Sequence, residues 1–298
     1  MSEGAPMTDL DRAASFLAAH ARILDRRRFE ALIHDDDAAR HAIVRGLDAY
    51  RNADGGYGWG LEPDLRAPES QPAAALHALE ALADAGPATS PHATALLDWL
   101  GAVTLPDGGL PFALPIADPA GCAPFWTQAD PAVSSLQITA AVAAQAHRAA
   151  RGDEAIRAHP WLQTATRYCF DAIREIDEEP FAYVLSFALA FLDETAETHA
   201  EAGELIGRLA RFLPRDGALP VAGGAPGEAV HVLSAPARPV RAILDPRAVA
   251  AELDRLERTQ LADGGWAVDF TSHSAAAALE WRGYTTVAAL ATLRRNGR

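Results

Sequence analysis

The segment from Tyr57 to Arg66 holds the residues of this chain that are best suited to chemistry. Glu62 and Asp64 stand two residues apart there, close to the aromatic side chains of Tyr57 and Trp59. Burial and a neighbouring like charge both raise the pKa of a carboxyl group, so one of the two would keep its proton. A protonated carboxyl group can act as a general acid toward an alkene or an epoxide. The structural alternative is an ion pair of Glu62 or Asp64 with Arg66 that holds the loop in place.

A second segment with aromatic and acidic side chains covers residues 125–130. Its Trp126 could line a hydrophobic pocket or stabilise a carbocation, a contact worth roughly 0.5–2 kcal/mol. Asp130 could add a carboxylate to the same site. Because it stands directly before Pro131, a helix N-cap is the structural alternative for Asp130.

A third segment, residues 269–282, contains a histidine between carboxylates. The imidazole of His273 could form an acid–base pair with Asp269 or with Glu280, although a histidine in a loop is more commonly solvated. Trp281 follows directly and is a candidate for the wall of a pocket.

Three polar side chains occur on segments that are otherwise apolar. Gln137 needs a partner if it is buried, and either a ligand or a neighbouring helix could supply one. Tyr183 either fills the core or faces a central cavity. His77, in the middle of an apolar helix, is expected to be a hydrogen-bonded core residue.

Composition narrows the classes of protein that fit this chain. The 298 residues are 49% hydrophobic and carry a formal net charge of −14, which fits a folded protein and argues against a nucleic-acid partner. Cys122 and Cys169 belong to no Cys/His cluster, so neither a zinc site nor a disulfide framework is expected. The longest apolar run is too short to span a bilayer. We therefore expect a cytoplasmic protein, and a protein partner or a homodimer is compatible with the sequence.

Two classes of helix alternate along the chain. Apolar helices are expected at residues 72–85, 132–148 and 181–192, and amphipathic ones at 92–103, 161–176, 196–212 and 247–260. A helix that is apolar on all sides must lie inside a layer of helices that are apolar on one side. The pattern predicts an all-α fold, a double-layered α/α toroid, with a loose tail at residues 1–7 and a single domain at residues 8–298. Residues 215–246, rich in proline and glycine, give no clear helix.

A sequence repeat supports this arrangement. Leu256, Gln260, Gly264 and Trp266 follow one another at spacings of four, four and two residues. Weaker copies end in glycine turns after Asp residues at positions 54, 107 and 216. A period of about fifty residues is the signature of a repeat architecture.

This stretch resembles the QW repeat of the squalene-hopene cyclase and oxidosqualene cyclase family, and the related repeats of protein prenyltransferase β subunits. The resemblance implies the α/α toroid of terpenoid cyclases, a hydrophobic isoprenoid-type substrate in a central cavity, and acid-initiated cyclisation or isomerisation. The acidic Asp-x-Asp-Asp motif of the cyclases and the zinc ligands of the prenyltransferases are absent. No resident cofactor is therefore implied, and Mg²⁺ would be needed only if the ligand carried a diphosphate.

Two alternative functions remain at this level: a non-catalytic toroid that binds a ligand or a partner, and a carbohydrate-active enzyme with paired carboxylates and stacking tryptophans. The residues expected to carry catalysis are Glu62, Asp64, Asp130, Asp269 and His273. Those expected to contact a ligand are Tyr57, Trp59, Arg66, Trp126, Gln137, Tyr183, Trp266 and Trp281.

Overall fold

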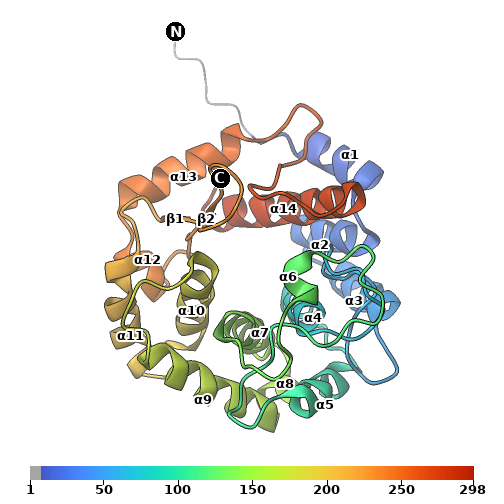
Figure 1. Ribbon diagram of the computed structural model, residues 1–298. Coiled ribbons are helices and arrows are strands. Elements are labelled where there is room, and N and C mark those ends of the chain that lie inside the picture. Colours follow the sequence, from blue (N-terminus) through green and yellow to red (C-terminus); the bar gives the residue numbers. More distant parts are fainter. Residues whose placement is uncertain (1–7) are drawn as a thin grey trace.

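Helices make up most of residues 8–298, the part of the chain that the computed structural model describes (Figure 1). The first seven α-helices are α1 (Leu10–His20), α2 (Ile23–His34), α3 (Asp37–Leu47), α4 (Pro72–Ala85), α5 (Ala93–Val103), α6 (Pro124–Thr127) and α7 (Leu136–Ala149). The next seven are α8 (Glu154–Arg157), α9 (Pro160–Arg174), α10 (Ala182–Thr195), α11 (Glu201–Leu209), α12 (Pro239–Ile243), α13 (Pro246–Arg258) and α14 (Ala275–Arg295). Short 3₁₀ turns, Asp48–Tyr50 and Ala210–Phe212, extend α3 and α11.

The longer helices are arranged around a common centre, with α4, α7, α10 and α14 nearer to it and α5, α9, α11 and α13 toward the periphery (Figure 1). Composition explains the difference. In α4, ten of fourteen residues are buried, many of them alanines that let α7 approach closely, and α7 packs in the same way against α10. In α13, only Val249 and Leu253 are buried, so one narrow face holds this helix to the core.

Two helices begin several residues later than predicted: α11 begins at Glu201 and not at residue 196, and α7 also begins late. A helix was expected from residue 132, but α7 begins at Leu136, with the side chain of Ser135 as its N-cap. Asp130 instead accepts a hydrogen bond from the backbone N–H of Ala132 at 2.9 Å and stabilises a turn. The N-cap interpretation of Asp130 was therefore wrong, because a second polar residue closer to the apolar run caps the helix.

The proline- and glycine-rich segment between α11 and α13 lacks a long helix in the structure as well. Strands β1 (Ala218–Pro220) and β2 (Ala229–His231) form an antiparallel hairpin in which Leu219 pairs with Val230. The five-residue helix α12 follows, and both α12 and β2 contact α10. A hairpin and one short helix thus connect α11 to α13, in agreement with the absence of a clear helical pattern in this segment.

Three copies of Asp-Gly-Gly, at residues 54–56, 107–109 and 263–265, adopt the same turn. The first glycine of each copy has a φ of 94° or 95°, a conformation that favours glycine. Each aspartate accepts a hydrogen bond from the backbone N–H two residues later, at 3.0–3.1 Å. A Cβ atom on Gly264 would lie 2.2 Å from the carbonyl oxygen of Arg12 in α1, so this turn also needs glycine for close packing.

The last of these turns joins the two ends of the described chain. The side-chain amide of Gln260 accepts a hydrogen bond from the backbone N–H of Asp9 at 2.8 Å and donates to the carbonyl oxygen of Asp9 at 2.9 Å. Trp266 is 2% exposed, and its indole N–H donates to the carbonyl oxygen of Leu256 at 2.8 Å. Helices α1 and α14 also pack together. The structure therefore places Trp266 in the core, beside this closing contact.

Candidate functional site

The loop at residues 57–69 has a buried side and an exposed side. Glu62 is 5% exposed and Asp64 is 4% exposed, and Tyr57 is buried as well. Trp59, by contrast, is 58% exposed, and its indole N–H donates to the side-chain oxygen of Asn52 at 2.7 Å. The two carboxylates therefore lie inside the protein, whereas Trp59 lies on its surface.

Glu62 is paired with a histidine of α4. Its Oε2 atom lies 2.9 Å from Nε2 of His77, and Nδ1 of His77 lies 3.3 Å from Oε2 of Glu80. Burial by itself lowers the pKa of His77, but the hydrogen bonds to Glu62 and Glu80 and the negative charges of both outweigh burial and raise the pKa to about 9. At neutral pH the imidazole is therefore positively charged and held between two carboxylates.

The row of polar groups continues from Glu80 into two other helices. The hydroxyl group of Tyr284 in α14 donates to Glu80 at 2.8 Å, and the guanidinium of Arg28 in α2 lies 3.4 Å away. Burial opposes ionisation of Glu80, but Arg28 and His77 together hold its pKa far below the usual range. Residues 62, 77, 80 and 284, with Arg28, thus form one hydrogen-bonded network that joins the loop to α2, α4 and α14. We call it the His77 network.

Asp64 faces another way and ties the loop to the start of α14. It accepts hydrogen bonds from the Ser272 hydroxyl at 3.0 Å, the His273 backbone N–H at 2.7 Å and the Trp281 indole N–H at 2.8 Å. Arg66 pairs with Glu280 at 2.6 Å. The predicted ion pair of Arg66 with Glu62 or Asp64 does not occur within residues 8–298, because a carboxylate from α14 lies within reach of the guanidinium.

Aromatic rings surround the imidazole of His77. Trp281 and Tyr284 approach it edge-on, with ring centroids 5.7 and 5.4 Å away. Phe270 in turn contacts Trp281 at 5.2 Å. Of the residues singled out from the sequence, the structure therefore brings Glu62 and Trp281 to this imidazole, while Asp64 bonds to the far side of the same site through Trp281.

The remaining predicted residues lie elsewhere. Asp130, Asp269 and His273 are exposed, and within residues 8–298 the side chain of His273 makes no hydrogen bond to Asp269 or Glu280. Trp126 is buried and stacks on Phe112, with ring centroids 4.6 Å apart. The hydroxyl group of Tyr183 donates to Glu228 of the hairpin at 3.2 Å, and Gln137 is half-buried near the start of α7.

Sequence reasoning had not assigned Glu80, Tyr284 and Arg28 to any site, and it read His77 as a hydrogen-bonded core residue, as its contacts confirm. One signal was available. His77 and Glu80 are three residues apart on an apolar helix, and so are Trp281 and Tyr284, which places each pair on one helix face. The link between the two helices has no such signal, because about 200 residues separate Glu80 from Tyr284.

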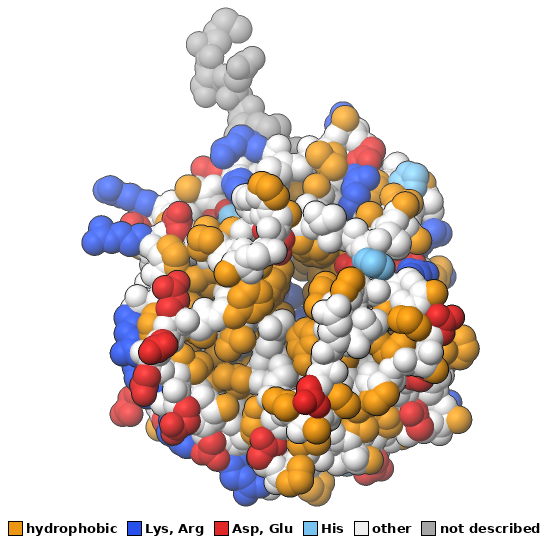
Figure 2. All heavy atoms as spheres, in the orientation of Figure 1, with side chains coloured by type: hydrophobic (Ala, Val, Ile, Leu, Met, Phe, Trp, Pro, Cys, Tyr) orange, Lys and Arg blue, Asp and Glu red, His pale blue; other side chains and the backbone are white. Residues whose placement is uncertain are grey.

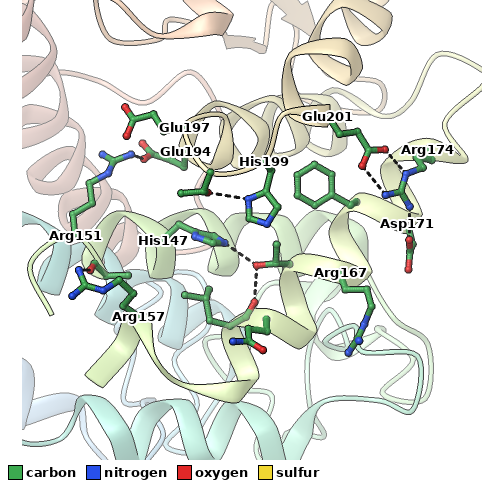
Figure 3. A pocket seen from close by; sticks show the side chains of 16 residues that line it. His147, Arg151, Arg157, Arg167, Asp171, Arg174, Glu194, Glu197, His199 and Glu201 are labelled. Atoms are coloured by element: carbon green, nitrogen blue, oxygen red, sulfur yellow. Dashed lines mark hydrogen bonds and ion pairs between the residues drawn. The ribbon is translucent and has the colours of Figure 1, made fainter. Parts of the chain in front are cut away.

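A separate pocket of about 530 Å³ opens between α7, α9, α10 and α11 (Figure 3). Its histidine, His147, lies 2.7 Å from the hydroxyl group of Thr166, and the ring of Phe170 lies 5.1 Å from that of His199. Burial, followed by the nearby His199 and Arg151, lowers the pKa of His147 to about 4. The rim consists of ion pairs, among them Arg174 with Asp171 and Glu201, and Arg151 with Glu194. None of these residues was expected from the sequence to form a site.

No protein-family model matches this chain, and no curated protein matches it. Within residues 8–298, no helix is long and apolar enough to cross a membrane. In the same part of the chain, no group of three or more His, Cys, Asp or Glu side chains is arranged to hold a metal ion.

Proposed function

We propose that this protein is an α/α toroid of the kind found in terpenoid cyclases and prenyltransferases, and that it binds a hydrophobic, isoprenoid-type molecule at its centre. Three features support the proposed architecture. Central and peripheral helices alternate along the chain, the glycine turn recurs with the same geometry, and Gln260 joins the last repeat to the first.

The observation that carries the proposed ligand is an exposed stripe on the central helix α10. Tyr183, Phe187 and Ala190 follow one another on one face of this helix; the two aromatic residues are half-buried, and Ala190 is exposed although both of its chain neighbours are buried. The rings of Tyr183 and Phe187 are 6.1 Å apart. Figure 2 shows a hollow near the middle of the molecule with hydrophobic side chains around it. We propose that the stripe on α10 faces this hollow, where it would suit an apolar ligand.

The chemistry of the His77 network favours binding over acid-initiated cyclisation. An acid that protonates an alkene must be a carboxyl group that keeps its own proton. Glu62 instead accepts a hydrogen bond from an imidazole that is charged at neutral pH, and Asp64 accepts three hydrogen bonds. Both carboxylates are thus engaged by partners inside the protein, so we assign the His77 network and Asp64 to holding the wall of the site.

Filling the hollow tests this proposal. Ala190→Trp would place an indole ring in it, and Ala251→Trp adds the same ring at an exposed position of α13 as the matched control. We expect farnesol or geranylgeraniol to bind the wild-type chain in titration calorimetry, and Ala190→Trp to weaken binding at least about tenfold, because it occupies the space of several ligand carbons. Ala251→Trp should bind like the wild type. Absence of binding to the wild type, or equal binding by both variants, would contradict the proposal.

A further inference from the structure

A pocket of about 460 Å³ lies where the C-terminal turns of several helices meet. It is lined by Arg28, Ala31, Leu32, Asp35, Arg40, Ala83, Asp84, Arg148, Val287, Ala291, Arg294 and Arg295. These residues come from the ends of α2, α4, α7 and α14 and from the start of α3. Glu62 and Asp64, in the loop before α4, are outside its lining. We call it the arginine pocket.

The charge of the pocket lining is positive, whereas the net charge of the whole chain is negative. The whole sequence has 40 acidic and 26 basic side chains, and all the basic ones are arginines. The arginine pocket has five arginines and only two aspartates, a formal surplus of three positive charges. A surplus of this size in one small cavity of an acidic protein creates a local positive potential.

The two aspartates satisfy only part of this charge. Asp84 is shared, because it pairs with Arg28 at 2.7 Å and also with Arg148. Asp35 pairs with Arg40, which also contacts Asp37 at 3.1 Å. Arg28 has a further carboxylate partner in Glu80, 3.4 Å away, so the excess positive charge of the lining lies at the arginines of α7 and α14.

Arg294 and Arg295 supply the remaining charge. Both side chains are open to solvent, and within residues 8–298 neither one forms an ion pair with an acidic side chain. Partial burial of the Arg295 guanidinium lowers its pKa, and the positive charge of Arg148 lowers it further. The negative charges of Asp84, Glu194 and Glu80 act in the opposite direction. The positive charge of Arg148 is therefore felt at Arg295 in spite of the shared aspartate.

We infer that the arginine pocket binds a multivalent phosphate-type oxyanion. Planar guanidinium groups donate paired hydrogen bonds that match the oxygens of phosphate, and several around one cavity can hold more than one phosphate group. The C-terminal ends of helices carry a partial negative charge that favours nearby arginines, but this effect acts on the last turn of each helix separately. That effect does not explain why four helices place their arginines around the same cavity.

The inference goes beyond the proposed hydrophobic site and does not depend on it. Two sources of the anion share the same chemistry: a free diphosphate, or the diphosphate head group of an isoprenoid whose tail lies in the hollow. Only the second source rests on the proposed function.

The test compares a double variant with a matched control. Arg294→Gln with Arg295→Gln removes the two charges that lack carboxylate partners, whereas Arg258→Gln removes an exposed arginine from the last turn of α13. Binding of sodium diphosphate, farnesyl diphosphate and farnesol to the full chain is measured by titration calorimetry at low ionic strength. Urea unfolding of each variant checks that its fold is retained, which we expect because the substituted side chains are exposed.

We expect the double variant to weaken diphosphate binding about tenfold or more and Arg258→Gln to leave it unchanged. Binding of inorganic diphosphate by the wild type would identify a site for the free anion. Tight binding of farnesyl diphosphate alone, lost in the double variant, would identify a head-group site. If farnesol binds as tightly as farnesyl diphosphate, or if all variants bind alike, the inference is wrong while the hydrophobic site stands. Failure of farnesol alone overturns only the hydrophobic site.

Discussion

Two histidines on neighbouring central helices have opposite electrostatic surroundings. His77 on α4 lies between Glu62 and Glu80, and its pKa is raised to about 9. His147, in the last turn of α7, faces the Thr166 hydroxyl, and its pKa is lowered to about 4. Burial disfavours the charged imidazole in both places. The partners therefore decide the charge: carboxylates reverse the effect of burial at His77, and a hydroxyl group with cationic neighbours cannot do so at His147.

The comparison also separates the two regions by function. The His77 network joins three helices and a loop through charged groups, so removing its histidine leaves Glu62 buried without a cation, and Glu80 keeps only Arg28. The pocket at His147 holds its charges at the rim and keeps a neutral ring inside. We therefore expect the first region to dominate stability and the second to tolerate substitution.

The largest expected effect follows from replacing each histidine by leucine. His77→Leu leaves Glu62 and Glu80 buried without their shared cation and should lower the free energy of unfolding by about 3–5 kcal/mol at pH 7. His147→Leu should lower it by no more than about 1 kcal/mol, because Thr166 still donates to the carbonyl oxygen of Leu162. Urea unfolding followed by circular dichroism measures both values. Equal losses in the two variants would remove the distinction between the regions.

The pH dependence of stability should show both histidines with opposite signs. His77 binds its proton more tightly in the folded state, so its contribution is complete below pH 6.5 and is lost as the pH rises to about 9, on the order of 3 kcal/mol. His147 binds its proton less tightly in the folded state, so stability falls as the pH falls from 6.5 to about 4. Urea unfolding between pH 4 and 9.5 measures both limbs. His77→Leu should flatten the alkaline limb alone, and His147→Leu should make the acidic limb less steep; any other assignment contradicts the pKa directions.

Smaller effects than that of His77→Leu are expected from the hydroxyl groups that contact Glu80 in the first region and His147 in the second. Tyr284→Phe removes a donor to the carboxylate of Glu80 and should cost about 1.5–3 kcal/mol. Thr166→Val removes a neutral hydrogen bond to His147 and should cost about 0.5–1.5 kcal/mol. Thermal unfolding of the two variants under identical conditions ranks them. A larger loss for Thr166→Val would show that charge does not set the difference.

Local patterns predicted much of the fold. The burial of residues 72–85 on nearly all sides follows from an almost unbroken run of alanine and leucine, and the structure confirms this helix at the same bounds. The start of α7 was misplaced because two capping residues compete there, and Ser135 lies nearer to the apolar run than Asp130. Turn chemistry was readable because Asp-Gly-Gly encodes its own hydrogen bond.

The candidate site was only half predictable. Sequence reasoning placed Glu62 and Asp64 together by their spacing, but their side chains point to α4 and α14, so each one binds to a different helix. Which helix each carboxylate reaches depends on contacts across 15 to 217 residues of chain. Spacing along the sequence shows which residues share a helix or a loop. It does not show which residues from distant parts of the chain will contact them.

The contact between Gln260 and Asp9 spans 251 residues, and it limits how this protein can change in size. An open array of repeats can gain or lose a unit at either end, because each unit touches only its neighbours. Here the last turn must meet the first helix at hydrogen-bond distance, with no room for a Cβ atom at Gly264. Adding or deleting one helix pair would move these two ends apart. In the proposed toroid, this contact would fix the copy number of the repeat and confine variation in length to the loops between helices.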